Sequence, residues 1–127
     1  MALLPTLLVA AAACVGAWHE SVTGHYDGWV QSNNLMTVET WIEVAPDGRL
    51  SGRYLLHETG RDVPGVLEPA ANGNCQEAWF RWTDLYGSGT VRLQFYPDRH
   101  CFEGAWAPGL AVPTLPWTTC DKPPAVS

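Results

Sequence analysis

The residues whose side chains could bind a metal or catalyse a reaction are scattered along the chain. No two of the four histidines are two residues apart, as on one face of a strand, or four apart, as on one face of a helix. The histidines are His19, His25, His57 and His100. Metal sites commonly draw ligands from such close pairs. The spacing therefore favours structural or solvent-facing histidines, and neither a metal nor another cofactor is expected.

Two acidic residues, Glu77 and Asp84, could supply the general acid and base that glycoside hydrolysis requires. Asp84 is in phase with Phe80 and Trp82, so we expect it to point inward near one end of a barrel. A carboxylate there needs a partner, such as a turn N–H from residues 87–89. A turn-stabilising aspartate fits this position better than a catalytic one.

No other catalytic motif is found. Ser88 lies between two glycines but not in the G-x-S-x-G pattern of a nucleophile elbow. A glycine-rich phosphate loop followed by a helix start is also missing, which argues against nucleotide chemistry. Glu58 and Asp62 flank a turn, and we expect them to face solvent. The sequence does not predict an enzyme.

The charge balance excludes another class of partner. The chain has a formal net charge of −6 and a single lysine, Lys122. Because binding to phosphates requires a basic patch, neither nucleic acid nor an anionic membrane surface is expected as partner. A hydrophobic content of 46% with seven tryptophans is typical of a packed globule.

Residues 1–17 have the features of a signal peptide. They carry no charged side chain, contain the apolar run 7–13 and end in Val15-Gly16-Ala17, small residues that signal peptidase accepts. The run is shorter than the roughly 20 apolar residues of a membrane span. Cleavage after Ala17 predicts export to the extracellular space or the periplasm. The alternative, a lipid anchor on Cys14, is less favoured because the sequence before it lacks the usual leucine and a basic residue.

Three cysteines remain after that cleavage, namely Cys75, Cys101 and Cys120. An oxidising compartment favours a disulfide, and three thiols allow at most one bridge within the chain. The spacing does not say which two are paired. The third thiol would be buried or would link two chains in a homo-oligomer.

A strand, a Pro-Asp turn and a return strand occur twice. Residues 42–47 lead into 50–54, and residues 93–98 lead into 102–106, each with alternating apolar positions. Proline and aspartate favour a tight turn, and Gly48 can adopt the left-handed conformation that closes the first one. With a three-residue loop at 46–48, the pairing would place Arg53 opposite Trp41.

Seven strands are expected, separated by turn signals, and consecutive short reversals favour a meander. Pro64 weakens one of them, which we therefore expect to be short and at an edge or a bulge, and 69–74 is expected to be a loop. The expected strands are 25–31, 35–44, 49–57, 63–68, 77–85, 90–96 and 101–107.

Closure of the meander would remove exposed edges, so the sequence predicts an all-β, antiparallel up-and-down barrel of about seven or eight strands, with a β-sandwich as the alternative. The barrel domain would span residues 18–107. The proline-rich tail 108–127 is expected to lack regular structure and to be held to the barrel by Trp117 and Cys120.

Two resemblances support this architecture. Gly28-Trp29, Met36-Thr37-Val38 and the stretch 48–54 resemble the opening hairpins of the avidin and streptavidin family, a calycin-type barrel that binds biotin. The resemblance implies that Tyr54 contacts a ligand, whereas Gln31 and Leu35 depart from the family pattern. Residues 82–106 are similar to a Trp/Gly-punctuated pattern in small secreted proteins of unassigned function.

The aromatic residues suggest the function. Barrels of about eight strands have room for side chains alone or for one small ligand. The sequence therefore predicts a secreted, non-catalytic barrel that binds a small apolar or aromatic molecule, or a sugar. The expected lining residues are Trp29, Tyr54, Trp82 and Trp106. The alternative is a solid barrel of the envelope or extracellular space whose outer face, with Trp41 and Trp79, binds a protein or glycan.

Overall fold

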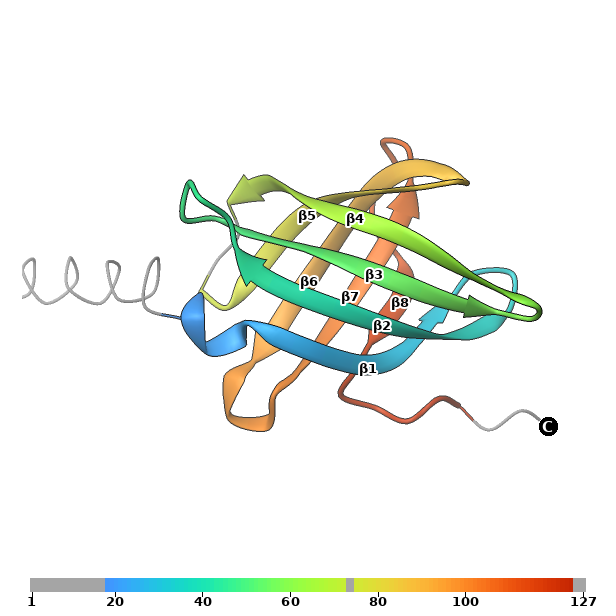
Figure 1. Ribbon diagram of the computed structural model, residues 1–127, viewed down its shortest axis with the longest axis horizontal. Coiled ribbons are helices and arrows are strands. Elements are labelled where there is room, and N and C mark those ends of the chain that lie inside the picture. The colour runs from blue at the N-terminus through green and yellow to red at the C-terminus, as the bar shows by residue number, and fades with distance from the viewer. Residues whose placement is uncertain (1–17, 73–74, 125–127) are drawn as a thin grey trace, which may run out of the picture.

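The computed structural model describes residues 18–72 and 75–124, in which eight antiparallel strands form a closed barrel. Each strand pairs with its neighbours in the chain, and the last pairs with the first, so the predicted up-and-down barrel is confirmed and the sandwich is wrong (Figure 1). The strands are β1 (Gly24–Gln31), β2 (Leu35–Val44), β3 (Leu50–Glu58), β4 (Arg61–Asn72), β5 (Glu77–Asp84), β6 (Gly87–Tyr96), β7 (Cys101–Pro108) and β8 (Leu115–Thr118).

Two short 3₁₀ helices complete the fold, η1 (Glu20–Val22) before β1 and η2 (Pro97–Arg99) before β7. In the part of the chain that the structure describes, no helix is long and apolar enough to span a bilayer. The predicted signal peptide, residues 1–17, and the alternative lipid site at Cys14 lie outside the described residues.

The β2–β3 hairpin has the predicted register. Trp41 pairs with Arg53, and the guanidinium carbon lies 4.2 Å from the centre of the indole ring. The turn closes through a hydrogen bond of 2.8 Å from the Gly48 N–H to the Ala45 carbonyl, with φ of +86° at Gly48. A left-handed residue is required there, and glycine adopts this conformation without a steric penalty.

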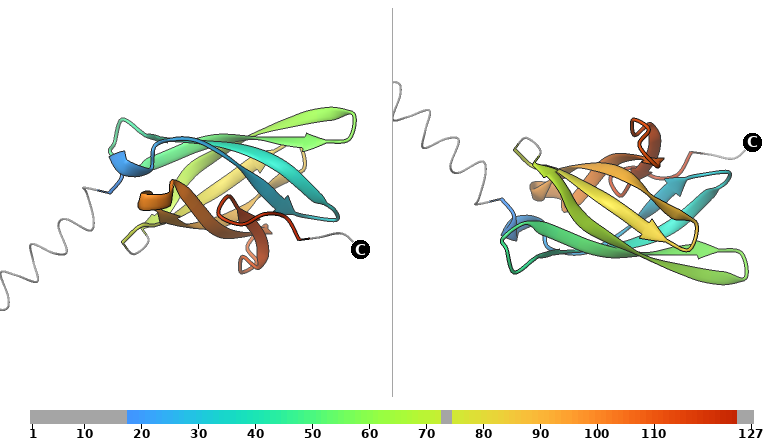
Figure 2. Two further views of the ribbon diagram at one scale, coloured as in Figure 1. Left: turned by 90° about the horizontal axis from the view of Figure 1, so that it is seen from below. Right: turned by 90° about the horizontal axis from the view of Figure 1, so that it is seen from above.

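β4 differs most from the prediction. It is a strand of 12 residues that runs through Pro64 and across most of the expected loop 69–74, with a register shift between Pro69 and Asn72. Pro64 is tolerated because it pairs with Leu55 of β3 in a part of β4 that lies beyond the ladder with β5, which begins at Val66. In both views of Figure 2 the β3–β4 hairpin extends past its neighbours.

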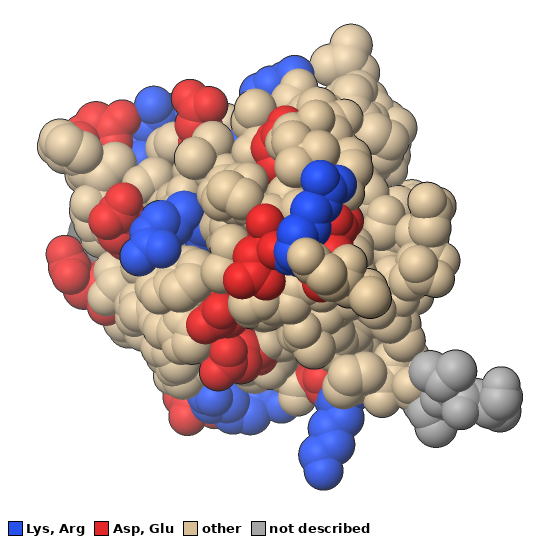
Figure 3. All heavy atoms as spheres, turned by 45° about the vertical axis from the view of Figure 1, so that its right-hand side comes forward, with Lys and Arg blue, Asp and Glu red and all other residues tan. Residues whose placement is uncertain are grey.

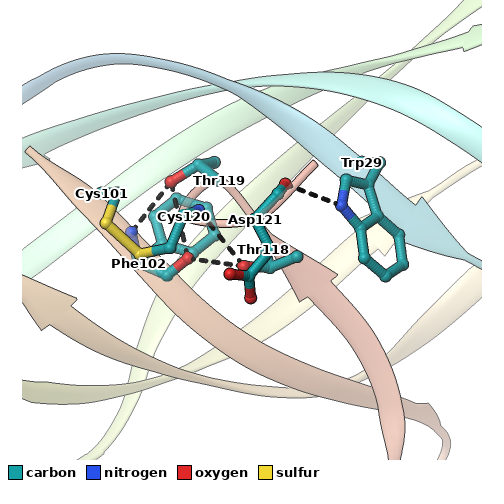
Figure 4. Close-up of a disulfide and its surroundings, with 7 residues drawn as sticks. All are labelled: Trp29, Cys101, Phe102, Thr118, Thr119, Cys120 and Asp121. Carbon is teal, nitrogen blue, oxygen red and sulfur yellow. Dashed lines mark hydrogen bonds between the residues drawn. A yellow bond between two sulfur atoms is a disulfide. The ribbon is translucent and has the colours of Figure 1, made fainter. Parts of the chain in front are cut away.

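The tail is part of the barrel, so the predicted boundary at residue 107 and the absence of regular structure after it are wrong. β8 pairs with β7 from Glu103 to Trp106 and with β1 at Trp29 and Val30. A disulfide joins Cys101 at the start of β7 to Cys120 just after β8 (Figure 4). Cys75 is exposed and is not a free thiol, so the expected spare thiol is not found among the described residues.

Hydrogen bonds around this disulfide fix the end of β8. The Thr119 hydroxyl accepts a bond of 2.8 Å from the Phe102 N–H, and the Thr118 hydroxyl donates to the Phe102 carbonyl at 3.1 Å. Further along, the Asp121 carbonyl accepts a bond of 3.0 Å from the indole N–H of Trp29 (Figure 4). The segment after β8 therefore covers the outer side of β1.

The barrel is filled at the end next to η1. Phe80, Phe95 and Phe102 are completely buried there, with the last two packed edge to face at 5.6 Å. Val22 of η1 is also fully buried, and its carbonyl accepts a hydrogen bond of 2.6 Å from the Tyr26 hydroxyl. Large aromatic side chains dominate the burial of such a core, and at this end they occupy the interior of the barrel.

Candidate functional site

A cavity of about 350 Å³ lies at the opposite end, where the β1–β2, β3–β4 and β5–β6 connections meet. We call it the mouth cavity. Three of the four predicted lining residues, Tyr54, Trp82 and Trp106, belong to it. The complete lining is Val30, Ser32, Asn33, Asn34, Met36, Tyr54, Leu56, Glu58, Trp82, Asp84, Tyr86, Trp106 and Trp117.

Trp29, the fourth predicted lining residue, lies outside the barrel. On β1 the inward positions are Tyr26 and Val30, so the intervening Trp29 points outward. It is nevertheless buried, with 8% of its surface exposed, because the segment around Asp121 covers it and accepts a hydrogen bond from its N–H. The prediction failed because an aromatic side chain can be buried on either face of this strand.

Trp82 and Trp106 form one wall of the mouth cavity, on β5 and β7. Their rings are nearly perpendicular at 87°, with centres 5.5 Å apart. The Trp82 N–H donates to the Ala107 carbonyl at 3.1 Å and the Trp106 N–H to the Gln31 carbonyl at 2.9 Å. Because both indole N–H groups have backbone partners, the rings are held in place without a ligand.

Tyr54 and Asp84 form a second wall. The Tyr54 hydroxyl donates to Asp84 Oδ2 at 2.7 Å, and the Tyr86 N–H donates to Asp84 Oδ1 at 2.8 Å. The prediction that Asp84 points inward near the mouth is therefore confirmed, although its turn partner is Tyr86. Burial raises the pKa of the Tyr54 phenol, and the adjacent Asp84 carboxylate raises it further.

The position of Tyr54 depends on Gly65, its partner on β4. A Cβ at residue 65 would overlap the Tyr54 ring. Glycine in a strand interior often marks such a close approach. Gly65 therefore provides the space in which the phenol lies and reaches Asp84.

Trp117 on β8 is the lining tryptophan that the sequence did not assign to a site. It is 3% exposed and packs edge to face against Tyr54, with ring centres 5.0 Å apart. Its buried N–H has no hydrogen-bond partner among the described residues. One signal could have found it: in a closed up-and-down barrel neighbouring strands alternate in direction, so an even number is required and seven predicted strands leave one missing.

Glu58 also lines the mouth cavity, so the expectation that it simply faces solvent is wrong. Its side chain is 19% exposed and accepts the Tyr86 hydroxyl at 2.6 Å and Arg61 Nε at 3.1 Å. The Tyr86 hydrogen bond, followed by Arg61, holds the pKa of Glu58 below its usual range. Glu58 is therefore an ionised carboxylate with a cationic neighbour.

Glu77 and Asp84 are not a catalytic pair, because they occupy the two ends of β5. At about 3.3 Å of rise per residue, they are roughly 23 Å apart along the strand. Glu77 instead accepts the Trp79 N–H at 3.1 Å and lies 3.6 Å from Arg92.

The outer face brings together residues that the sequence keeps apart. Glu39 contacts both His25 at 2.9 Å and His57 at 2.8 Å, and His57 also contacts Asp62 at 2.8 Å. Potential ligand atoms of His25, Asp27 and Glu39 lie within 4.8 Å of one another, which spacing along the chain did not indicate. We interpret the cluster as an ion-pair network, because both Glu39 oxygens are already paired, Oε1 with His25 and Oε2 with His57. Figure 3 likewise shows acidic and basic side chains intermixed on the face it presents.

The fold and the mouth cavity define the class of protein: a small closed β-barrel with fully buried aromatic side chains at one end and an aromatic-lined cavity at the other. Comparisons with protein-family models, curated proteins and solved structures found no match. The resemblance to the avidin and streptavidin family therefore stays a prediction. Of the residues that carry it, Tyr54 lines the mouth cavity.

Proposed function

We propose that the protein is a secreted, non-catalytic binding protein that holds one small molecule in the mouth cavity. The observation that carries this proposal is the contrast between the two ends of the barrel. One end is packed with fully buried phenylalanines, whereas the other has a cavity of about 350 Å³ lined by three tryptophans. Ligand sites are typically mostly apolar cavities of about 300–1,000 Å³ with a few polar groups.

The anchoring of the aromatic rings supports binding of a small ligand. Trp82 and Trp106 are held by backbone carbonyls, and Tyr54 is held by Asp84. A site that is already ordered loses little side-chain entropy on binding, which favours affinity. A flat or apolar ligand would gain stacking and apolar contacts from these rings.

The carboxylates support a role without catalysis. A general acid for glycoside hydrolysis needs a raised pKa, whereas Tyr86 and Arg61 lower the pKa of Glu58. Both Asp84 oxygens accept hydrogen bonds that orient Tyr54 and the β5–β6 turn. Export is supported by the sequence of residues 1–17 and by the Cys101–Cys120 disulfide.

The alternative, binding through the outer-face tryptophans of a solid barrel, has less support. Trp41 is covered by Arg53 on one side and contacts the His25 ring at 5.0 Å. The indole N–H of Trp79 already donates a hydrogen bond to Glu77. The interior, moreover, has a cavity.

Intrinsic tryptophan fluorescence tests the proposal. The purified protein is titrated with small aromatic and apolar compounds, biotin and monosaccharides, alongside two variants. Trp106→Leu alters the cavity wall, and Trp41→Leu is the matched control on the outer face. We expect at least one compound to bind the wild type and the control but not Trp106→Leu. Absence of binding across the panel, or binding that Trp106→Leu leaves unchanged, would contradict the proposal.

A further inference from the structure

The lining of the mouth cavity carries negative charge. Its lining includes two carboxylates, Glu58 and Asp84, and no lysine, arginine or histidine. Glu58 is paired with Arg61 at 3.1 Å. Asp84 has no such partner: its two hydrogen-bond donors, the Tyr54 hydroxyl and the Tyr86 N–H, are both neutral, and no ion pair involves it within the described residues. The cavity lining therefore contains one carboxylate that forms no ion pair in the described part of the chain.

The walls beside this carboxylate are aromatic. Trp82 and Trp106 meet at 87°, and Tyr54 and Trp117 meet at 79°. In a near-perpendicular pair the edge of one ring meets one face of the other, and the ring faces carry partial negative charge. A cation within about 6 Å of such a face is attracted to it, most strongly when both are removed from water. Asp84 and these rings thus favour the same sign of charge in a ligand.

A third, independent observation concerns a hydrogen bond that is missing. The indole N–H of Trp117 is buried without a partner in the described structure, although the residue is 3% exposed and lines the cavity. A buried polar group without a hydrogen bond is destabilising. Because this nitrogen has less than 1 Å² of accessible surface, an oxygen acceptor on a ligand would satisfy it only after the Trp117 ring shifts toward the cavity.

We propose that the mouth cavity binds a small organic cation, an alkyl- or arylammonium ion that also carries an oxygen acceptor. The ammonium group lies against Asp84 and the indole faces, and a shift of the Trp117 ring on binding brings its N–H to the acceptor. This inference rests on the proposed function, because it names the class of ligand for the same cavity. Sugars and neutral aromatic compounds satisfy the rings but leave the Asp84 charge without a partner.

Two compounds of the same shape test the inference. Acetylcholine has a quaternary ammonium and an ester carbonyl, and 3,3-dimethylbutyl acetate replaces the charged nitrogen with carbon. We expect isothermal titration calorimetry to show a preference of about tenfold or more for the cation, as cation–π and carboxylate contacts in a desolvated site imply. Equal or tighter binding of the neutral compound overturns the inference.

Matched variants locate the source of the preference. Asp84→Asn should reduce it to roughly twofold or less, because the amide keeps the shape and removes the charge. Asp98→Asn makes the same change of net charge in η2, at the packed end of the barrel, and should retain the full preference. Loss of the preference in both variants would show a long-range charge effect and would also overturn the inference. If Asp84→Asn does not fold, as judged by its circular dichroism, the two-compound comparison on the wild type decides alone.

A protein that binds no small molecule and a protein whose ligand is not a cation give different results in these experiments. If neither compound binds and no compound of the wider panel changes the tryptophan fluorescence, the proposed function itself is wrong. If the neutral compound binds at least as well as the cation and Trp106→Leu abolishes that binding, the cavity is a ligand site and only the inferred cationic class is wrong.

Discussion

Removal of the Cys101–Cys120 disulfide tests how the barrel is closed. β8 has four residues and pairs with β1 at two positions, so its attachment depends strongly on the bridge that follows it. The variant Cys101→Ala/Cys120→Ala removes the bridge and adds no polar group at Cys101, which is 7% exposed. A double variant is preferable to a reductant, because it removes this bridge alone.

The expected magnitude follows from the length of the loop. The two cysteines are 19 residues apart. In the chain-entropy model, a cross-link over that separation stabilises the folded state by about 3 kcal/mol at 25 °C. Because the slope for a small protein in urea is about 1–3 kcal/mol per M, the midpoint of unfolding should fall by roughly 1–3 M.

Urea unfolding followed by circular dichroism gives this free energy, and tryptophan fluorescence reports on the same sample. Since β8 carries Trp117, we also expect ligand binding in the mouth cavity to weaken in the variant. A variant within about 0.5 kcal/mol of the wild type would refute the reasoning, because that is the usual effect of a neutral surface substitution.

Three further predictions concern the site and the outer face. Tyr54→Phe leaves Asp84 without its hydroxyl donor and should destabilise the protein by about 1–3 kcal/mol in urea unfolding, whereas Tyr96→Phe at the opposite end should have little effect. Gly65→Ala should displace the Tyr54 ring, lower stability by about 1–3 kcal/mol and weaken ligand binding. An unchanged free energy of unfolding and an unchanged ligand affinity would contradict the close approach of Gly65 to the Tyr54 ring. Asp62 and Glu39 raise the pKa of His57 above 6.5. The stabilisation that protonated His57 gives the folded state is therefore fully present below pH 6.5 and is lost as the pH rises through the folded-state pKa. The pKa of Glu39 is lowered from 4.5, so the stabilisation that its carboxylate gives is lost as the pH falls through this lowered pKa. The stability difference between wild type and His57→Gln should therefore be larger at about pH 5.5 than at about pH 9, and a larger difference at the higher pH would contradict this assignment.

Local sequence rules accounted for most of the fold. Alternation of side chains located β2 fully, and the Pro-Asp-Gly turn fixed the pairing of Trp41 with Arg53. The errors arose where tertiary contacts outweigh local preference. Pro64 is tolerated inside β4 because that part of the strand pairs on one side only. β8 forms in a proline-rich segment because two neighbouring strands and a disulfide hold it.

The site could be predicted only in part, because local sequence rules place side chains on strand faces but do not reveal tertiary contacts. Tyr54, Trp82 and Trp106 lie on strands whose inward phase was clear, so the sequence placed them inside. Trp29 was misplaced because its burial comes from the segment after β8 and not from the interior. Trp117 was missed because it lies on the strand that was not predicted. The cluster around Glu39 joins residues from separate strands, and only the register of β1, β2 and β3 reveals it.

The most direct test of the central claim uses the seven tryptophan side chains as reporters. Their indole N–H signals can be followed in two-dimensional ¹H–¹⁵N NMR spectra while acetylcholine is added. We predict saturable shifts of Trp82, Trp106 and Trp117, which line the mouth cavity, and unchanged signals from Trp41 and Trp79 on the outer face. Shifts confined to Trp41 and Trp79, or no shift with any compound that binds, would contradict a ligand site inside the barrel.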